Sequence, residues 1–392
     1  MEFRLDIEDY INETDYQWDG NNETVCHNLL IISRLYPPDL AVPLYGYAMP
    51  FLFVTTAITN LLVVAVLWQR HMRSPTNAIL LAMALADTFT VCFPEPYFFY
   101  MYALNNYKEP LYPTAACYTW LFFHETIPNL FHTASIWLTV MLAGQRYIYV
   151  CHAPLARTWC TIFRVHVAIA VIFSLALFHQ MPRFLDTVYD PVQVVWDEGE
   201  QAGHCVDACH VRYADWVQIV SLDIYYSIYF WFRVLFVHMG PCTILVVLNG
   251  LLFNAMRNAQ KRRAQLLQEN RKSECKKLRD SNSTTIMLIC VIMVFLVTEI
   301  PLAIITLLHI IQTQWNIVII NYRLLYYYLI YSNSFIIFSY PVNFAIYCGM
   351  SRQFRETFRE LFVRGSAFTR PPDGDSSRYS MVNGPRTCVT ES

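Results

Sequence analysis

Residues 285–311, TIMLICVIMVFLVTEIPLAIITLLHII, carry a single charged side chain, that of Glu299. A helix needs about 20 predominantly apolar residues to cross a bilayer. In the bilayer core the backbone must also satisfy its own hydrogen bonds, which a continuous helix does. We therefore predict a membrane-spanning helix here, within an almost uncharged region that covers residues 281–322.

Six further stretches are similarly apolar, and each carries at most two charged residues. They cover residues 41–69, 75–91, 111–145, 165–182, 217–256 and 324–351. One isolated run would be compatible with a buried helix of a soluble protein, but seven in succession are not. The sequence thus predicts an all-α membrane protein built as a seven-transmembrane helix bundle.

The composition agrees with this prediction. Only 15% of the 392 residues are charged, against about a quarter in soluble domains, and 55% are hydrophobic. These values exclude disordered, collagen-like and coiled-coil classes. The formal net charge of −2 argues against a nucleic-acid partner.

Charges in the loops predict the orientation of the bundle. Basic residues dominate the loops after the first, third and fifth spans: Arg70 and Arg73, Arg157 and Arg164, and nine basic against three acidic residues between positions 257 and 280. Short basic loops stay in the cytoplasm. The first 43 residues carry nine acidic and two basic residues and two glycosylation sequons, at Asn12 and Asn22.

We therefore expect a multi-pass protein of the plasma membrane with its N-terminus outside and its C-terminus in the cytoplasm. The expected organisation is an extracellular, glycosylated segment (1–43), the bundle (44–350), a membrane-surface helix (351–363) and a cytoplasmic tail (364–392). Four of the twelve cysteines, Cys26, Cys117, Cys205 and Cys209, fall in the predicted extracellular segments, where disulfides form. Four cysteines allow three pairings, and their spacing does not choose among them.

A cluster of polar residues is predicted near the middle of the bundle. Asp87 lies in the second span, and Asn60, Ser135 and Asn343 lie at similar depth in the first, third and seventh. A charge inside a span is costly and faces the bundle interior. Two interpretations remain open: a site for a small cation such as sodium, or a water-filled hydrogen-bond network without an ion.

The end of the third span carries a recognisable motif. Gln145-Arg146-Tyr147, followed by Pro154-Leu155, resembles the Asp-Arg-Tyr and Pro-Leu signature of rhodopsin-like (class A) G-protein-coupled receptors, with Gln145 in place of the acid. Other positions match landmarks of that family in the right order. They are Asn60, Asp87, Pro241, Pro301 and residues 343–347, Asn-Phe-Ala-Ile-Tyr, where Phe344 replaces a proline.

The segment after the seventh span resembles the short amphipathic eighth helix of the same family. Its Phe354, Phe358 and Phe362 are spaced to lie on the membrane surface. Residues 145–154, 298–301, 348–358 and 379–384 are more closely similar to the sex peptide receptor group of invertebrate peptide receptors. This closer resemblance covers about residues 44–388.

The resemblance implies ligands and partners for the chain. The expected ligands are amidated myoinhibitory-type neuropeptides with two tryptophans, with sex peptide as a further ligand in some members. The expected partner is a heterotrimeric G protein of the Gi/o class, which lowers cAMP and alters the neuronal output that controls reproductive behaviour. The resemblance also implies a Cys117–Cys209 disulfide, and leaves Cys26 and Cys205 either paired or free.

The same resemblance assigns activation residues. Arg146 is expected to insert toward the G protein when the sixth span tilts about Pro301, opening a groove lined by Arg146, Leu155, Tyr347 and the basic stretch 257–277. Tyr147 of the same motif is also an expected activation residue. With Gln145 beside it, Arg146 can gain a hydrogen bond but no ion pair, so the resting state is expected to lose a charge-assisted restraint.

The outer parts of the spans predict what the pocket binds. Pro128 stands where amine receptors carry an aspartate, and the seventh span has no lysine for retinal, so a peptide fits better. The expected ligand-binding residues combine charged and aromatic side chains: Glu95, Tyr100, Glu125, Tyr229, Arg233, Glu299, Tyr327 and Tyr331. The alternative for each tyrosine is that its ring anchors a helix at the membrane interface.

Glu299 needs a partner because a buried carboxylate is costly. We favour Arg233 as that partner, and the alternatives are a contact with the ligand or a protonated, neutral Glu299. A rival function is a channel or transporter that uses Asp87, Glu125, Arg233 and Glu299 as an ion path, but the seven spans show no internal repeat. An inverted seven-span chemoreceptor channel is opposed by the basic loops, and the scattered histidines lack metal spacing, so we expect no enzyme and no metal site.

Overall fold

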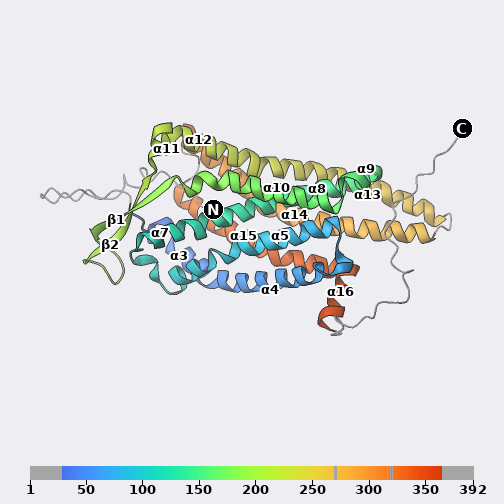
Figure 1. The fold of residues 1–392 in the computed structure, drawn as a ribbon, viewed down its shortest axis with the longest axis horizontal. Coiled ribbons are helices and arrows are strands. Elements are labelled where there is room, and N and C mark those ends of the chain that lie inside the picture. The colour runs from blue at the N-terminus through green and yellow to red at the C-terminus, as the bar shows by residue number, and fades with distance from the viewer. Residues whose placement is uncertain (1–28, 269–271, 316, 318, 320, 364–392) are drawn as a thin grey trace.

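The computed structural model describes residues 29–268, 272–315, 317, 319 and 321–363. In this part of the chain, seven helical segments run along the long axis of the molecule (Figure 1). The first joins α3 (Pro38–Ala41), η1 (Val42–Ala48) and α4 (Met49–Leu67), and the second joins α5 (Pro75–Cys92), α6 (Glu95–Phe98) and η3 (Phe99–Ala103). The third joins α7 (Thr114–Trp120), η5 (Leu121–Thr126) and α8 (Ile127–Cys151).

The fourth segment is α10 (Ile162–Gln180), which continues into η6 (Met181–Phe184). The fifth joins α12 (Leu222–Phe232), η7 (Arg233–Met239) and α13 (Gly240–Gln268), the sixth is α14 (Lys272–Trp315) and the seventh is α15 (Tyr322–Met350). The connections contain the short helices α2 (Ile32–Leu35), η2 (Arg70–Met72), η4 (Asn106–Lys108), α9 (Ala153–Trp159) and α11 (Asp215–Val220), and α16 (Arg352–Phe362) follows the bundle.

Among the described residues, six helices are long and apolar enough to cross a membrane. The third segment is long enough but carries more polar side chains. Its α8 packs against α5, α10, α13 and α14, so it occupies the interior of the bundle. Its buried polar residues, among them Asn129, His132, Thr133, Ser135 and Thr139, therefore face other helices instead of lipid.

Four of the segments contain a π-helical turn, and a proline follows three of these turns. Pro50 follows η1, Pro128 follows η5 and Pro241 follows η7, each two residues after the turn ends, and a proline cannot donate the regular hydrogen bond of an α-helix. Gly240 closes η7 by donating its backbone N–H to the carbonyl of Leu235. A Cβ at Gly240 would lie 2.5 Å from that carbonyl oxygen, so the turn requires glycine.

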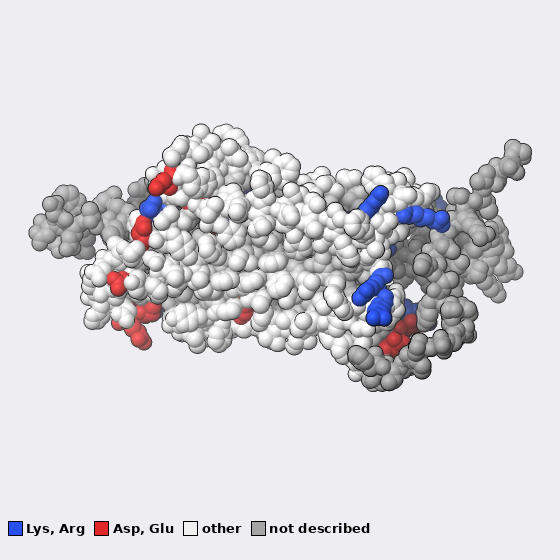
Figure 2. Space-filling model, viewed as in Figure 1, with Lys and Arg blue, Asp and Glu red and all other residues white. Residues whose placement is uncertain are grey.

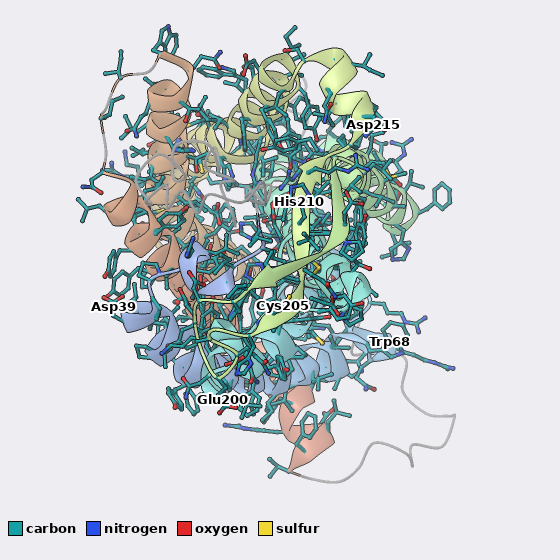
Figure 3. The ribbon with its side chains drawn as sticks, turned by 90° about the vertical axis from the view of Figure 1, so that its left-hand side faces the viewer. Asp39, Trp68, Glu200, Cys205, His210 and Asp215 are labelled. Carbon is teal, nitrogen blue, oxygen red and sulfur yellow. A yellow bond between two sulfur atoms is a disulfide. The ribbon has the colours of Figure 1, made fainter. Side chains whose placement is uncertain are left out.

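A β-hairpin covers one end of the bundle, which we call the hairpin end. Strands β1 (Thr187–Val195) and β2 (Cys205–Tyr213) pair antiparallel, with Pro191 opposite Cys209. Figure 3 looks onto this end and shows the hairpin crossing the bundle from near Asp215, past His210, toward Glu200 at its turn. The prediction of an all-α membrane protein did not include this strand pair.

The hairpin is fixed to the bundle at the middle of β2 and near its turn. Cys209 forms a disulfide with Cys117 of α7, which confirms that pairing. Near the turn, the Trp196 indole nitrogen donates to the carbonyl of Lys108 at 2.7 Å. On the free side of β2, the backbone N–H of Leu30 donates to the carbonyl of Cys209 at 3.0 Å, so the segment before the first helix also joins the sheet.

The opposite end, which we call the α16 end, bears the short amphipathic helix. α16 packs on the end of α15 through Phe354, which is buried against Phe344 and Tyr347. The expectation that Phe354 lies on the membrane is therefore wrong, because the first turn of α16 is used for packing. Phe362 is exposed at the far end of the helix, and Phe358 lies between these two environments.

Charges separate along the long axis. Figure 2 shows acidic side chains gathered mainly at the hairpin end, basic side chains toward the α16 end, and an almost uncharged band between them. The basic residues include Arg70, Arg73, Arg157 and Arg164, which are all exposed. The uncharged band has the pattern of a surface that faces lipid.

Candidate functional site

A cavity of about 60 Å³ opens within the bundle toward the hairpin end, and we call it the aromatic cavity. It draws its walls from four of the seven helical segments and from the chain that precedes the first. The lining includes the aromatic and polar side chains of Tyr36, Tyr45, Phe98, His124, Asn129 and His132.

Stacked rings form one wall of the aromatic cavity. Tyr45 and Phe98 stack with ring centroids 4.3 Å apart, and Tyr36 meets Tyr45 edge to face at 5.7 Å. His124 stacks on Trp120 at 4.3 Å and turns its edge toward Phe98. Such a wall can accept a further aromatic ring, because aromatic pairs contribute about 0.5–1.5 kcal/mol beyond the area that they bury.

Asn129 and His132 supply polar groups to the lining of the cavity. The Asn129 side-chain oxygen accepts a hydrogen bond from Arg233 at 3.3 Å. In the described part of the chain, the Asn129 amide nitrogen has no hydrogen-bond partner. The cavity thus offers both aromatic surface and an unused hydrogen-bond donor near its buried end.

Glu299 lies behind this lining, and its partners differ from the predicted one. Its Oε1 is 3.1 Å from Nε2 of His132, and its Oε2 is 3.7 Å from Nδ1 of His238. The predicted Glu299–Arg233 pair is wrong, because Arg233 is directed to Asn129. The π-helical turn η7 begins at Arg233, so counting regular helical turns back from Pro241 misplaces its side chain.

Glu125 belongs to a separate buried network close to the hairpin end. Arg183 donates to Glu125 at 2.7 Å and to Asp186 at 2.6 Å. Asp186 also accepts from the hydroxyl of Tyr225 at 3.1 Å. These groups join the third, fourth and fifth helical segments. Glu125 is already paired with Arg183 of the same chain, so it is not a free acidic group for a ligand.

The other predicted ligand residues lie in three different settings. Tyr229 is buried beside the Arg183 network and donates to Gln180 at 2.9 Å, and Tyr327 donates to Asp39 at the hairpin end. Tyr100 and Tyr331 are 52% and 56% exposed, as expected of rings that anchor helices at an interface.

Glu95 is buried, and within the described residues neither of its carboxylate oxygens has a hydrogen-bond partner. It stands next to Pro94, which lines the aromatic cavity. None of the eight predicted ligand residues lines the cavity. Glu95 and Glu125 are sequence neighbours of the lining residues Pro94 and His124, and Arg233 and Glu299 contact Asn129 and His132 of the lining.

The predicted central cluster is formed in part. Ser135 donates to Asp87 at 2.6 Å, whereas Asn60 donates to the neighbouring Thr88 at 3.2 Å. Asn343 is half-buried in α15, and no hydrogen bond between it and Asp87 occurs in the described chain. The Asp87 and Ser135 oxygens suit a sodium ion chemically. A sodium ion at this place stays a prediction.

The motif residues at the α16 end are held by neighbouring helices. Gln145 accepts a hydrogen bond from the Thr76 hydroxyl at 3.0 Å, so its side chain is bound to α5 and not to Arg146. The Arg146 guanidinium lies 5.8 Å from the centre of the Tyr149 ring. Leu155 is exposed on α9, and Tyr147 meets His152 edge to face.

Tyr347 is buried where α15 meets α16. Pro301 lies inside α14, where it interrupts the backbone bonding of that helix. The five motif residues and Pro301 therefore sit on helices whose packing links the α16 end to the middle of the bundle.

Several predictions fall on residues that the structure does not describe. Asn12, Asn22 and Cys26 lie in the undescribed segment 1–28, so glycosylation and a Cys26–Cys205 pair stay predictions. Cys205 is exposed and free among the described residues.

On the same hairpin, a hydrogen bond to Asp190 raises the pKa of the Arg212 guanidinium, with a further contribution from Asp215.

Sequence reasoning missed three residues of this region. Tyr36 precedes the first span and carried no motif. Arg183 lies one residue beyond the predicted fourth span. A basic residue so close to the end of a span could have been considered as a partner for Glu125. His132 is one of the scattered histidines that lack metal spacing, and no sequence pattern indicated that it lines the cavity and contacts Glu299.

Comparison with known proteins identifies the family to which this chain belongs. The family described as "Serpentine type 7TM GPCR chemoreceptor Srw" matches residues 47–365. The sex peptide receptor of Drosophila melanogaster is 48% identical, over 99% of this chain and 89% of its own length. Sex peptide receptor-related protein 2 of Caenorhabditis elegans is 33% identical, over 89% of this chain and 78% of its own length.

A more distant relative is the FMRFamide receptor of Drosophila melanogaster, 25% identical over 80% of this chain and 53% of its own length. The family consists of receptors and not of enzymes, and it accounts for seven spans, including the polar third one. This chain belongs to the serpentine seven-transmembrane G-protein-coupled receptors and is a homologue of the sex peptide receptor.

Proposed function

We propose that this receptor responds to amidated myoinhibitory-type neuropeptides that carry two tryptophans, and that sex peptide is a further ligand. The hairpin end faces the outside of the cell in this proposal, and the aromatic cavity receives part of the peptide. The observation that carries the proposal is the 48% identity to a protein named sex peptide receptor, extending over almost the whole chain.

The chemistry of the cavity supports a peptide with aromatic side chains. Tyr36, Tyr45 and Phe98 present ring faces and edges on which an indole can pack. The unpaired amide nitrogen of Asn129 can donate to a carbonyl oxygen of the ligand. The distant relative named FMRFamide receptor also points toward a peptide ligand.

The proposed signal leaves at the α16 end. There the exposed basic side chains and Arg146 would meet a heterotrimeric G protein of the Gi/o class, which lowers cAMP and so alters the neuronal output that controls reproductive behaviour. The charge separation along the molecule supports this orientation, since basic segments remain on the cytoplasmic side of a membrane.

The experiment is a peptide panel applied to cells that express the full chain in the plasma membrane. Amidated two-tryptophan peptides and sex peptide are expected to inhibit stimulated cAMP production, and pertussis toxin is expected to abolish the response. The free-acid form of each peptide and the Arg146→Ala variant serve as controls. Absence of any response at micromolar peptide, with the receptor at the cell surface, would refute the proposed ligand class.

The rival ion path has less support. It would run through Asp87, Glu125, Arg233 and Glu299, but three of these four side chains are engaged by hydrogen bonds to neighbouring residues. Glu125 is bound by Arg183, Asp87 by Ser135, and Arg233 reaches Asn129. Membership of a receptor family also gives no reason to expect ion flux.

A further inference from the structure

Three buried side chains from three helical segments meet beneath the aromatic cavity. Glu299 of α14 lies between His132 of α8 and His238 of η7, at distances of 3.1 Å and 3.7 Å. The three residues are between 0% and 6% exposed. We call this group the Glu299 triad.

The triad connects the cavity with two interruptions of helix geometry. His132 lines the cavity, whereas Glu299 and His238 lie behind it. Glu299 stands two residues before Pro301, where α14 lacks a regular hydrogen bond, and His238 belongs to a π-helical turn. Helices bend at such places. A change at His132 can therefore reach the point at which α14 bends most readily.

The carboxylate of Glu299 is incompletely satisfied in the described structure. Neither oxygen has a hydrogen bond of good geometry, and the His238 contact is too long to be one. Arg233, the nearby cation that was expected to pair with it, is directed to Asn129 instead. Glu299 thus depends mainly on the close contact with His132, and a buried charge that loses its partner is strongly destabilised.

We propose that His132 is the positioning residue through which an occupied cavity acts on α14. A ligand that draws the His132 ring away from Glu299 leaves the carboxylate without its nearest partner. The conformation in which α14 has moved at Pro301 is then favoured, because it gives the carboxylate a different environment. The role of a ligand rests on the proposed function, but the coupling of His132 to Glu299 has a consequence that needs no ligand.

That consequence is ligand-independent activity in a variant that lacks the contact. The His132→Phe variant, purified as the full chain in lipid nanodiscs, is expected to raise nucleotide exchange on a panel of heterotrimeric G proteins roughly five- to tenfold. Adding Glu299→Gln is expected to return exchange to within about twofold of the unmodified receptor, because an amide carries no charge that requires the contact.

Two further variants separate this coupling from a general loss of packing. His179→Phe makes the same change on α10, at a histidine whose ring contacts Tyr229 and Phe232, and is expected to leave exchange unchanged. His132→Gln keeps a hydrogen-bond donor near Glu299 and is expected to give a nucleotide-exchange rate between those of the unmodified receptor and His132→Phe. It also serves in place of His132→Phe where that variant folds poorly.

A distance measurement makes the test independent of the G-protein class. Spin labels at Ser283→Cys of α14 and Arg73→Cys, both exposed positions, report the separation of helix ends in a background with Cys151 and Cys205 replaced by serine. His132→Phe is expected to shift the distance distribution, and the double variant to shift it back.

The proposal is overturned if His132→Phe changes neither the exchange rate nor the distance. It is also overturned if the double variant keeps the raised activity, since His132 would then act through packing and not through the carboxylate. A peptide panel without any active member would defeat the proposed ligand class while leaving these ligand-free results intact. The two failures are therefore distinguishable.

Discussion

Gln145 shows how one side chain can alter the resting state of the receptor. The Asp-Arg-Tyr signature that residues 145–147 resemble has an acid beside the arginine, whereas the Gln145 amide oxygen accepts a hydrogen bond from Thr76. Arg146 is left near the Tyr149 ring, where the attraction is weaker than that of an ion pair. We therefore expect the resting state to lack one electrostatic restraint at the α16 end.

The Gln145→Asp variant restores an anion next to Arg146. We expect ligand-independent nucleotide exchange to fall roughly two- to tenfold, because charge-assisted hydrogen bonds are about twice as strong as neutral ones. Exchange is measured on purified receptor at matched amounts, with Gln145→Asn as the control for side-chain shape. Equal exchange by the Asp variant and the unmodified receptor would show that this position does not set basal activity.

At the scale of elements, the helices were predictable and their local irregularities were not. Long apolar runs predicted all seven spanning segments, because the bilayer dictates length and composition. Some bounds differ: the second segment ends at Ala103 and the fifth at Gln268, each twelve residues beyond the predicted end, and the sixth begins at Lys272, nine residues before the predicted start.

A π-helical turn such as η7 changes which side chains share a face. Gly240 and Pro241 follow η7, but a proline in a spanning helix is equally compatible with a simple kink, so the sequence did not predict the turn. The position of the Arg233 side chain was mispredicted for this reason. The partners of Glu299 were mispredicted as a result, because they are His132 and His238 and not Arg233.

The Arg183 network illustrates an element contact that sequence reasoning could not assemble. Glu125 and Asp186 are far apart from each other in sequence, and only the packing of α10 on the third segment brings the guanidinium between them. The hairpin was missed for a related reason. Its strands contain alternating valines, but their pairing is fixed by a disulfide and by contacts with distant loops.

The Arg183→Met variant would leave two buried carboxylates without their shared cation. We expect it to lower receptor stability by about 3–5 kcal/mol, seen as a lower thermal midpoint in detergent. Adding Glu125→Gln and Asp186→Asn removes the charges and is expected to restore most of the loss. A triple variant no more stable than Arg183→Met would indicate that packing, and not charge pairing, holds these segments together.

For the whole molecule, the separation of charge predicts its orientation in the membrane. The hairpin end is acidic and the α16 end is basic, with an almost uncharged band between them (Figure 2). The translocation machinery leaves short basic segments in the cytoplasm. The sequence contained this information, because loop charges can be counted without knowing how the helices pack.

Two exposed free cysteines offer a matched test of orientation. Cys205 lies on the hairpin and Cys151 at the end of α8. A membrane-impermeant thiol reagent applied to intact cells is expected to label Cys205 in a Cys26→Ser background, and to label Cys151 only after permeabilisation. Each site is read in a variant that lacks the other cysteine. The reverse pattern would place the hairpin end in the cytoplasm.

The segment before the first helix has a consequence for the kinetics of binding. Tyr36 forms part of the cavity wall, and Leu30 ties the same segment to Cys209, whose disulfide holds the hairpin. A peptide that occupies the aromatic cavity, as we propose, contacts the wall to which this tethered segment contributes Tyr36. We expect the tether to slow both the arrival and the departure of such a peptide. Slow association is then accompanied by slow release, so a peptide once bound is expected to keep the receptor occupied long after its free concentration has fallen.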